Sequence, residues 1–243
     1  MATPIGNLED ITLRAVRILQ EADLIAAEDT RHTLKLLNHL KIKKPLISYY
    51  KQNEKIKTKK LINKLLNGEN IALVSDAGTP VISDPGEEIA KEAINNNIDV
   101  VPIPGACALI NSLISSGINA KEFIFIGFLP ANAKEKETKL EEYKNIKQTL
   151  IFYEAPHKLK GTLENIKEVL GDRHICLARE LTKIHEEFIR GTISEVLEKC
   201  QEPKGEFVIV AEGANKNAKE ELKEFINTLT LDEHMKFYTD KRN

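Results

Sequence analysis

The sequence has few cysteines and no long apolar run, and both shortages argue against classes of protein. Its three cysteines, Cys107, Cys176 and Cys200, are odd in number and far apart, which favours reduced thiols over a disulfide framework or a zinc site. No apolar stretch approaches the ~18 residues that a membrane helix needs, and the early polar residues Asn7 and Glu9 do not fit a secretion signal. We therefore expect a cytoplasmic protein without a metal site.

The common nucleotide-binding motifs are missing as well. The chain contains neither Gly-x-Gly-x-x-Gly nor Gly-x-x-x-x-Gly-Lys-Ser/Thr, which argues against an ordinary dinucleotide site or a P-loop. Its 243 residues, 42% apolar and 30% charged, are typical of a globular protein with one large or two medium domains.

What the sequence does contain is a dense loop at residues 75–86, Ser-Asp-Ala-Gly-Thr-Pro-Val-Ile-Ser-Asp-Pro-Gly, directly after the apolar run 71–74. Its glycines and prolines fix unusual backbone angles, while its side chains present hydroxyls and carboxylates. Because ligands bind at the carboxyl ends of strands in open α/β sheets, we expect a ligand loop. Carboxylates such as Asp76 and Asp84 accept from hydroxyl or ammonium groups, so the ligand should carry a ribose, an amino-acid-like group or a phosphate.

Strand-like and helix-like segments alternate along the chain, which predicts βα units and an α/β fold. The rhythm restarts at about residue 118, so we expect two domains, 1–117 and 118–243, with a tail from 215 that the pattern does not place. The more polar segment 186–190 suits an edge strand. The expected strands are 24–27, 46–50, 71–75, 98–103, 123–126, 149–153, 174–180, 186–190 and 207–211.

The charge is unevenly distributed although the net charge is only −2. The segment 41–64 carries nine lysines against the single acid Glu54. Such a patch binds nucleic acid by releasing counterions, but a charge run is equally compatible with a solvated helix face.

Several ordered blocks of the sequence resemble a known family. They are 3–12, 27–31, 75–86, 102–106, 127–130, 153–157 and 178–183. In this order they resemble the small-subunit ribosomal RNA methyltransferases of the tetrapyrrole methylase superfamily. The resemblance implies two α/β/α domains with the cofactor cleft between them, in a homodimer. It also implies S-adenosylmethionine-dependent methylation of a cytidine ribose 2′-oxygen in the decoding region of 16S rRNA.

The resemblance also implies which residues contact the cofactor and the RNA. The cofactor set from the first domain is Pro4, Gly6, Asp76, Ala77, Gly78, Thr79, Ser83, Asp84, Pro104, Gly105 and Ala106, and the weaker choices from the second are Tyr153, Glu154 and Ala211. For the RNA we predict the basic residues Arg31, Lys41, Lys43, Lys44, Lys51, Lys55, Lys57 and Arg179.

A ribose hydroxyl is a weak nucleophile, so a base near the reacting oxygen would help, although alignment alone is an alternative. One candidate cluster contains Asp29 beside Arg31 and His32. A second contains Glu180 and Lys183, with Arg179 and Glu154 close by. We predict Asp29, Glu180 and Lys183 as the catalytic set. Either arginine could instead grip a phosphate, and Arg179 with Glu180 could be a structural ion pair.

Two departures from the family pattern carry expectations of their own. Only Met1 and Ala2 precede Thr3, where the family has an apolar strand, so we expect a gap in the first sheet with unpaired backbone groups. The segment after Leu231 is also shorter than in the family pattern, which leaves its function open. Two other functions stay open: carbon methylation of a tetrapyrrole, and RNA binding without catalysis.

Overall fold

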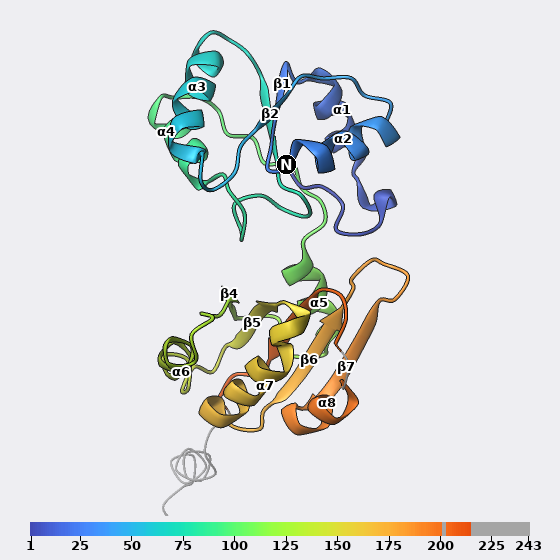
Figure 1. Ribbon diagram of the computed structural model, residues 1–243, viewed down its shortest axis with the longest axis vertical. Helices are drawn as coiled ribbons and strands as arrows, with labels where there is room; N and C mark the ends of the chain where they lie inside the picture. The colour runs from blue at the N-terminus through green and yellow to red at the C-terminus, as the bar shows by residue number, and fades with distance from the viewer. Residues whose placement is uncertain (201–202, 215–243) are drawn as a thin grey trace, which may run out of the picture.

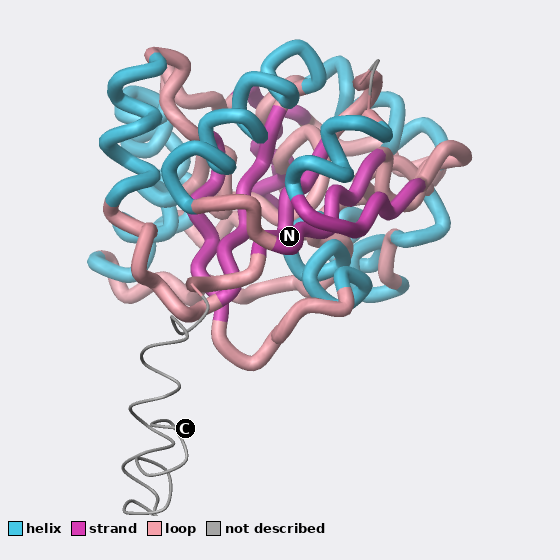
Figure 2. Tube along the Cα trace, turned by 90° about the horizontal axis from the view of Figure 1, so that it is seen from below, coloured by secondary structure: helices cyan, strands magenta, loops and turns pink. Residues whose placement is uncertain are grey.

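The computed structural model describes residues 1–200 and 203–214, so the expectations for the tail 215–243 lie outside the described residues. Figure 1 shows two lobes, one above the other, joined by the chain around residues 96–107. Figure 2 shows that helices surround the strands, as in an α/β fold. In the described part of the chain, no helix is long and apolar enough to cross a membrane.

The first lobe is built on a three-stranded parallel sheet in the order β2-β1-β3. Every residue of the central strand is buried, which suits a parallel strand covered on both faces. Thr12 caps α1 by accepting from Ala15 N. The elements are η1 (Leu8–Asp10), α1 (Leu13–Glu21), β1 (Leu24–Ala27), α2 (Thr30–His39), β2 (Leu46–Ser48), α3 (Glu54–Leu66), β3 (Ile71–Val74) and α4 (Glu87–Asn95).

The second lobe holds a five-stranded mixed sheet in the order β4-β5-β8-β6-β7. The more polar segment forms the edge strand β7, as the sequence predicts. Thr192 and Glu195 form a capping box that starts α8. The elements are α5 (Ala108–Ser116), β4 (Phe123–Phe128), α6 (Ala133–Glu141), β5 (Thr149–Glu154), α7 (Pro156–Leu170), β6 (His174–Arg179), β7 (Glu187–Thr192), α8 (Ile193–Lys199) and β8 (Phe207–Ala211).

Helix α5 packs on the sheet of the second lobe, although the sequence analysis assigns it to the first domain. Its Leu109 and Leu113 join the core formed by residues such as Ile151 and Val208. The Arg190 guanidinium donates to the last carbonyls of this helix. The domain boundary at 117/118 stays a prediction, and this packing favours a boundary before Ala108 instead.

The predicted strand 98–103 is wrong, because this segment is irregular. In the described residues no strand pairs with it, and β3 pairs only with β1. The first residues of the chain lie between them: the Met1 ammonium donates to Leu73 O at 2.8 Å and Ala2 N to Ile103 O at 3.1 Å. A strand needs a hydrogen-bonded neighbour for its backbone groups, and no described strand lies beside this segment.

Candidate functional site

Three carboxylates meet at the carboxyl end of the first sheet. Glu28 directly follows β1 and Asp76 follows β3 by two residues. The Asp76 carboxylate accepts from Asp29 N at 2.9 Å, and Asp76 N donates to Glu28 Oε2 at 3.3 Å, so the two strand ends are held together. Asp84 lies close enough for its charge to act on Glu28. The ligand loop predicted at this edge therefore brings its two aspartates beside Glu28.

The electrostatics of this cluster suit a cationic ligand. Burial raises the pKa of Glu28, and the charges of Asp84 and Asp76 raise it further. Burial likewise raises the pKa of Asp84, despite a hydrogen bond from Ser75. Carboxylates crowded in a partly buried site are stabilised by a cation or by hydroxyl donors. The cluster can therefore hold a sulfonium, an ammonium group or the diol of a ribose.

The backbone of loop 75–86 is fixed by two other segments that the sequence analysis assigns to the cofactor. Thr3 and Gly78 exchange both backbone hydrogen bonds, at 2.9 and 3.0 Å, and Thr79 Oγ1 donates to Ala106 O at 3.1 Å. Gly78 has φ +81°, a conformation that glycine adopts easily. Val81 has φ +77°, which is strained for a β-branched residue. The structure thus brings together the loops that contain Pro4, Ala77, Ser83, Pro104 and Gly105.

Gly6 faces the second lobe rather than loop 75–86. A Cβ on Gly6 would overlap Lys183 Cγ and lie 3.1 Å from Thr182 Oγ1, so any larger residue here would have to displace the Lys183 side chain. A cavity of about 880 Å³ opens beside this contact. No residue of loop 75–86 lines it, so we place the chemistry at the carboxylate cluster instead. The cavity is lined by Gly6, Asn7, Leu8, Glu9, Ile11, His39, Leu40, Thr182, Lys183, Ile184 and His185.

The cofactor candidates of the second lobe have structural partners. The Tyr153 hydroxyl accepts from Leu109 N at 3.1 Å, and burial raises its pKa to about 12. Glu154 is buried and accepts from Ala155 N at 2.9 Å and from Thr162 Oγ1 at 2.6 Å. Ala211 is fully buried within β8. The charge of Asp84 in the first lobe's loop acts on Tyr153, whereas Glu154 and Ala211 are buried, so the geometry disfavours these two as cofactor contacts.

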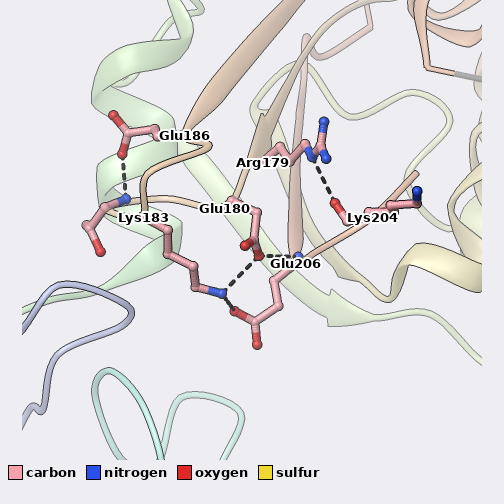
Figure 3. Close-up of polar contacts among 7 residues, drawn as sticks. Arg179, Glu180, Lys183, Glu186, Lys204 and Glu206 are labelled. Carbon is pink, nitrogen blue, oxygen red and sulfur yellow. Dashed lines mark hydrogen bonds and ion pairs between the residues drawn. The ribbon is translucent and has the colours of Figure 1, made fainter. Parts of the chain in front are cut away.

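The predicted catalytic cluster around Lys183 is an ion-pair network (Figure 3). The Lys183 ammonium lies 2.9 Å from Glu180 Oε1 and 2.8 Å from Glu206 Oε2. Burial lowers the pKa of Lys183, but these two partners outweigh it, so the pKa is raised. The hydrogen bond from Lys183 lowers the pKa of Glu180. A lysine held protonated is a cation and not a general base. A catalytic role for Lys183, as a cation, stays a prediction.

The turn that carries this network is strained. Glu180 and Thr182 have φ +49° and +67°, both left-handed. Thr182 N donates to Glu186, and the buried Thr182 Oγ1 has no hydrogen-bond partner among the residues that the structure describes. Backbone strain of this kind gathers at functional sites. Arg179 binds Lys204 O and Glu187, so it has structural partners, although the predicted Arg179–Glu180 ion pair is not among its contacts.

Asp29 is paired with its own neighbour. Arg31 Nη2 lies 2.6 Å from Asp29 Oδ2, and this hydrogen bond holds the pKa of Asp29 well below its usual range. The Arg31 side chain is 88% exposed, so it is open to a phosphate. Asp29 is thus an ionised carboxylate and a weak base.

The first sheet divides the lysines predicted to bind RNA. Lys43 and Lys44 lie before β2 and Lys51 lies after it, so they lie at opposite ends of the parallel strands. Lys55 is in the first turn of α3, where Glu54 accepts from Gly86 N at 2.8 Å at the end of the ligand loop. The structure therefore places Lys51 and Lys55 at the edge of the candidate site. Lys41, Lys43 and Lys44 lie at the other side of the sheet, by the amino ends of the strands (the far edge). Lys57 lies one turn into α3.

Sequence reasoning missed one residue of the site. Glu28 belongs to the carboxylate cluster, yet it is absent from the predicted site residues. The signal was available, since Glu28 is the first polar residue after the buried strand 24–27.

The comparisons with known proteins agree with this geometry. A family model described as tetrapyrrole (corrin/porphyrin) methylases matches residues 2–197. The chain is 54% identical over 215 residues to the ribosomal RNA small subunit methyltransferase I of Halalkalibacterium halodurans, spanning 88% of this chain and 74% of the relative. It is 52% identical over 241 residues to the protein of the same name from Bacillus subtilis, spanning 98% and 82%.

Two solved structures share the fold. They are uroporphyrin-III-C-methyltransferase from Thermus thermophilus, with TM-score 0.59 and 20% identity over 86% of this chain and 91% of that one, and the methyltransferase CobJ, with TM-score 0.61 and 16% identity over 88% and 92%. At this identity they show the fold alone, and they confirm the predicted fold class. The chain therefore belongs to the tetrapyrrole methylase family and, within it, to the ribosomal RNA small subunit methyltransferase I proteins.

Proposed function

We propose that this chain methylates ribosomal RNA of the small subunit with S-adenosylmethionine. More finely, we propose that the acceptor is the 2′-oxygen of a cytidine ribose in the decoding region of 16S rRNA. The names of the relatives support the substrate class. The observation that carries the proposal is the carboxylate cluster of Glu28, Asp76 and Asp84 beside a rigid loop, because it suits a cationic donor with a ribose.

The residues present fit this cofactor. Glu28 and Asp84 are partly buried carboxylates that favour a cation, and the hydrogen bonds of Gly78 with Thr3 and of Thr79 with Ala106 O hold loop 75–86 in place beside them. When bound, the sulfonium supplies an activated methyl group. The chain's own contribution is to align the ribose oxygen and to exclude water, which lowers the barrier through proximity.

Of the three predicted catalytic residues, only Lys183 keeps a role in the proposal, and that role is not that of a base. Lys183 acts as a cation near the RNA phosphates, because its partners hold it protonated. Asp29 and Glu180 have lowered pKa values, so neither is tuned to take a proton near neutral pH. We therefore propose that alignment dominates and that a tuned base is not required. A homodimer in the cytoplasm completes the proposal.

The test is methyl transfer to small ribosomal subunits from cells that lack the modification. With labelled S-adenosylmethionine we expect label in 16S rRNA, recovered after nuclease digestion as 2′-O-methylcytidine. A methylated base in place of the ribose would remove the finer part of the proposal. Label in uroporphyrinogen but not in RNA would favour a tetrapyrrole methylase. Cofactor binding without transfer to either would favour an RNA-binding protein without catalysis.

A further inference from the structure

The carboxyl end of β4 presents an aromatic ring to solvent at the border between the lobes. Phe128, the last residue of β4, is 60% exposed, whereas Gly127 before it is buried. The β4–β5 register shifts between Phe125 and Gly127, and Gly127 has φ +74°. Irregularities of this kind re-aim side chains and are frequent beside active sites. Here the shift accompanies an exposed ring where the strand ends.

A second aromatic side chain supports this ring from behind. The Phe128 and Tyr153 ring centroids lie 5.7 Å apart with planes at 67°, and Phe125 packs on Tyr153 at 4.9 Å and 68°. Tyr153 is itself fixed by the hydrogen bond from Leu109 N to its hydroxyl. Phe128 is therefore backed by a rigid cluster while much of its own surface stays open.

The open ring lies next to the candidate cofactor site. A Cβ on Gly127 would lie 3.9 Å from Ser83 Oγ, so the cofactor loop reaches the strand end that carries Phe128. The charge of Asp84 also acts on Tyr153. An RNA ribose aligned against the methyl group of a donor held at the carboxylate cluster would thus carry its base within reach of Phe128.

We propose that Phe128 is the stacking platform for an unpaired base of the RNA substrate at the reacting nucleotide. This inference rests on the proposed function. RNA-binding proteins hold splayed bases on aromatic side chains, and a ribose can be aligned only if its base is also held. The adenine of the cofactor is the competing occupant, and it is an outcome of the test.

The kinetic test uses the full chain with small subunits that lack the modification. We expect Phe128→Ala to lower kcat/KM for the subunits by about tenfold or more, and Phe128→Tyr to restore most of it, because stacking needs an aromatic face. Phe128→Leu keeps an apolar contact with Tyr153 without a π face, and should match the alanine variant while staying folded. The matched control is Phe123→Ala, an exposed ring at the opposite end of the same strand, which should leave kcat/KM unchanged.

The occupant is identified by a fluorescence titration. The sequence contains no tryptophan, so Phe128→Trp introduces a single reporter. We expect its emission to stay unchanged with S-adenosylmethionine, and the cofactor Kd of Phe128→Ala to stay within about twofold of the wild type. Quenching by the cofactor, with a matching loss of cofactor affinity, would assign the ring to adenine and overturn the proposal. Unchanged kcat/KM in Phe128→Leu, or failure of tyrosine to restore it, would do the same.

Failure of this inference can be told from failure of the proposed function. If the wild type transfers no methyl group to the subunits, the proposed function is wrong and the platform is wrong with it. If the wild type is active and Phe128→Leu is equally active, only the platform is wrong.

Discussion

At the scale of single residues, the acids of the candidate site lower the stability of the cofactor-free fold and favour binding of a cationic cofactor. Glu28 and Asp84 are acids whose pKa values are raised, first of all by burial. Such a carboxyl holds its proton more tightly in the folded chain, so its ionisation at neutral pH costs folding free energy. A bound cation would offset this cost. The empty site should therefore be a weak point of the fold that the cofactor strengthens.

Replacing Glu28 by glutamine should make the cofactor-free protein more stable and its cofactor affinity about tenfold weaker, since one charged partner is lost. The stabilisation should be largest at neutral pH and shrink as the pH falls, because the wild-type carboxyl then takes up its proton. Thermal unfolding between about pH 8 and about pH 5, with calorimetry at neutral pH, measures both effects. A loss of stability at neutral pH would contradict this account of the cluster.

Asp172→Asn is the control with the opposite sign. Ser194 donates to Asp172 through its backbone N at 2.9 Å and its hydroxyl at 2.6 Å, which lowers the pKa of this carboxyl. Its stabilising contribution is present above the unfolded pKa and lost as the pH falls. The asparagine variant should thus be less stable at neutral pH and approach the wild type in acid, with cofactor affinity unchanged.

Asp76 joins the ends of β1 and β3 besides contributing charge, so its replacement needs an isostere. Asp76→Asn keeps an oxygen that can accept from Asp29 N. We expect a cofactor affinity about tenfold weaker with unfolding close to that of the wild type. The exposed Asp99→Asn is the matched control. Calorimetry that finds equal affinity in both variants would remove Asp76 from the site.

At the scale of elements, a buried polar network joins β5, α6 and α7. Lys136 on α6 is only 7% exposed and donates to Thr162 on α7 at 2.8 Å, and Thr162 donates to Glu154 at the end of β5. This network holds the helix that follows the Phe128 strand against the sheet. The family resemblance implies a cofactor contact for Glu154, but burial and these partners favour a role in packing.

Glu154→Ala should therefore lower the free energy of unfolding by about 2 kcal/mol, because it leaves Thr162 and Ala155 N without their acceptor. Cofactor Kd of the folded protein should stay unchanged. The control, Glu164→Ala, removes an exposed carboxylate of α7 and should change stability by less than about 0.5 kcal/mol. A cofactor Kd that rises without any loss of stability would return Glu154 to the cofactor site.

Local patterns predicted most elements, and the failures have a common physical cause. Strand β1 follows from an apolar run, and the edge strand β7 follows from a more polar segment. The segment 98–103 has the composition of a strand but lacks a partner, which no local pattern reveals. In the site, the turn residues predict loop 75–86, and the family resemblance implies the other segments. The pairing of Lys183 with Glu206 joins positions far apart in sequence, so only the fold reveals it.

At the scale of the whole molecule, the lobes contact each other through particular loops. Gly6 packs on Lys183 and Thr182, and Ser83 lies beside Gly127. An RNA that reaches the carboxylate cluster must therefore approach the carboxyl edge of the first sheet. Only part of the basic segment lies at that edge, although the sequence presents the segment as one block.

Because the basic segment is divided in this way, its two interpretations, an RNA-binding patch and a solvated helix face, can be distinguished by experiment. Each lysine that contacts a phosphate contributes ~0.7–0.9 to the slope of log affinity against log salt. Lys51→Ala with Lys55→Ala, both exposed beside the site, should reduce that slope for small-subunit binding by up to about two. Lys41→Ala with Lys43→Ala removes the same charge from the far edge and should leave the slope unchanged. Equal losses in both pairs would mean a diffuse electrostatic effect. No loss in either pair would mean that the basic segment is a solvated face, because a lysine that contacts no phosphate does not contribute to the salt dependence of binding.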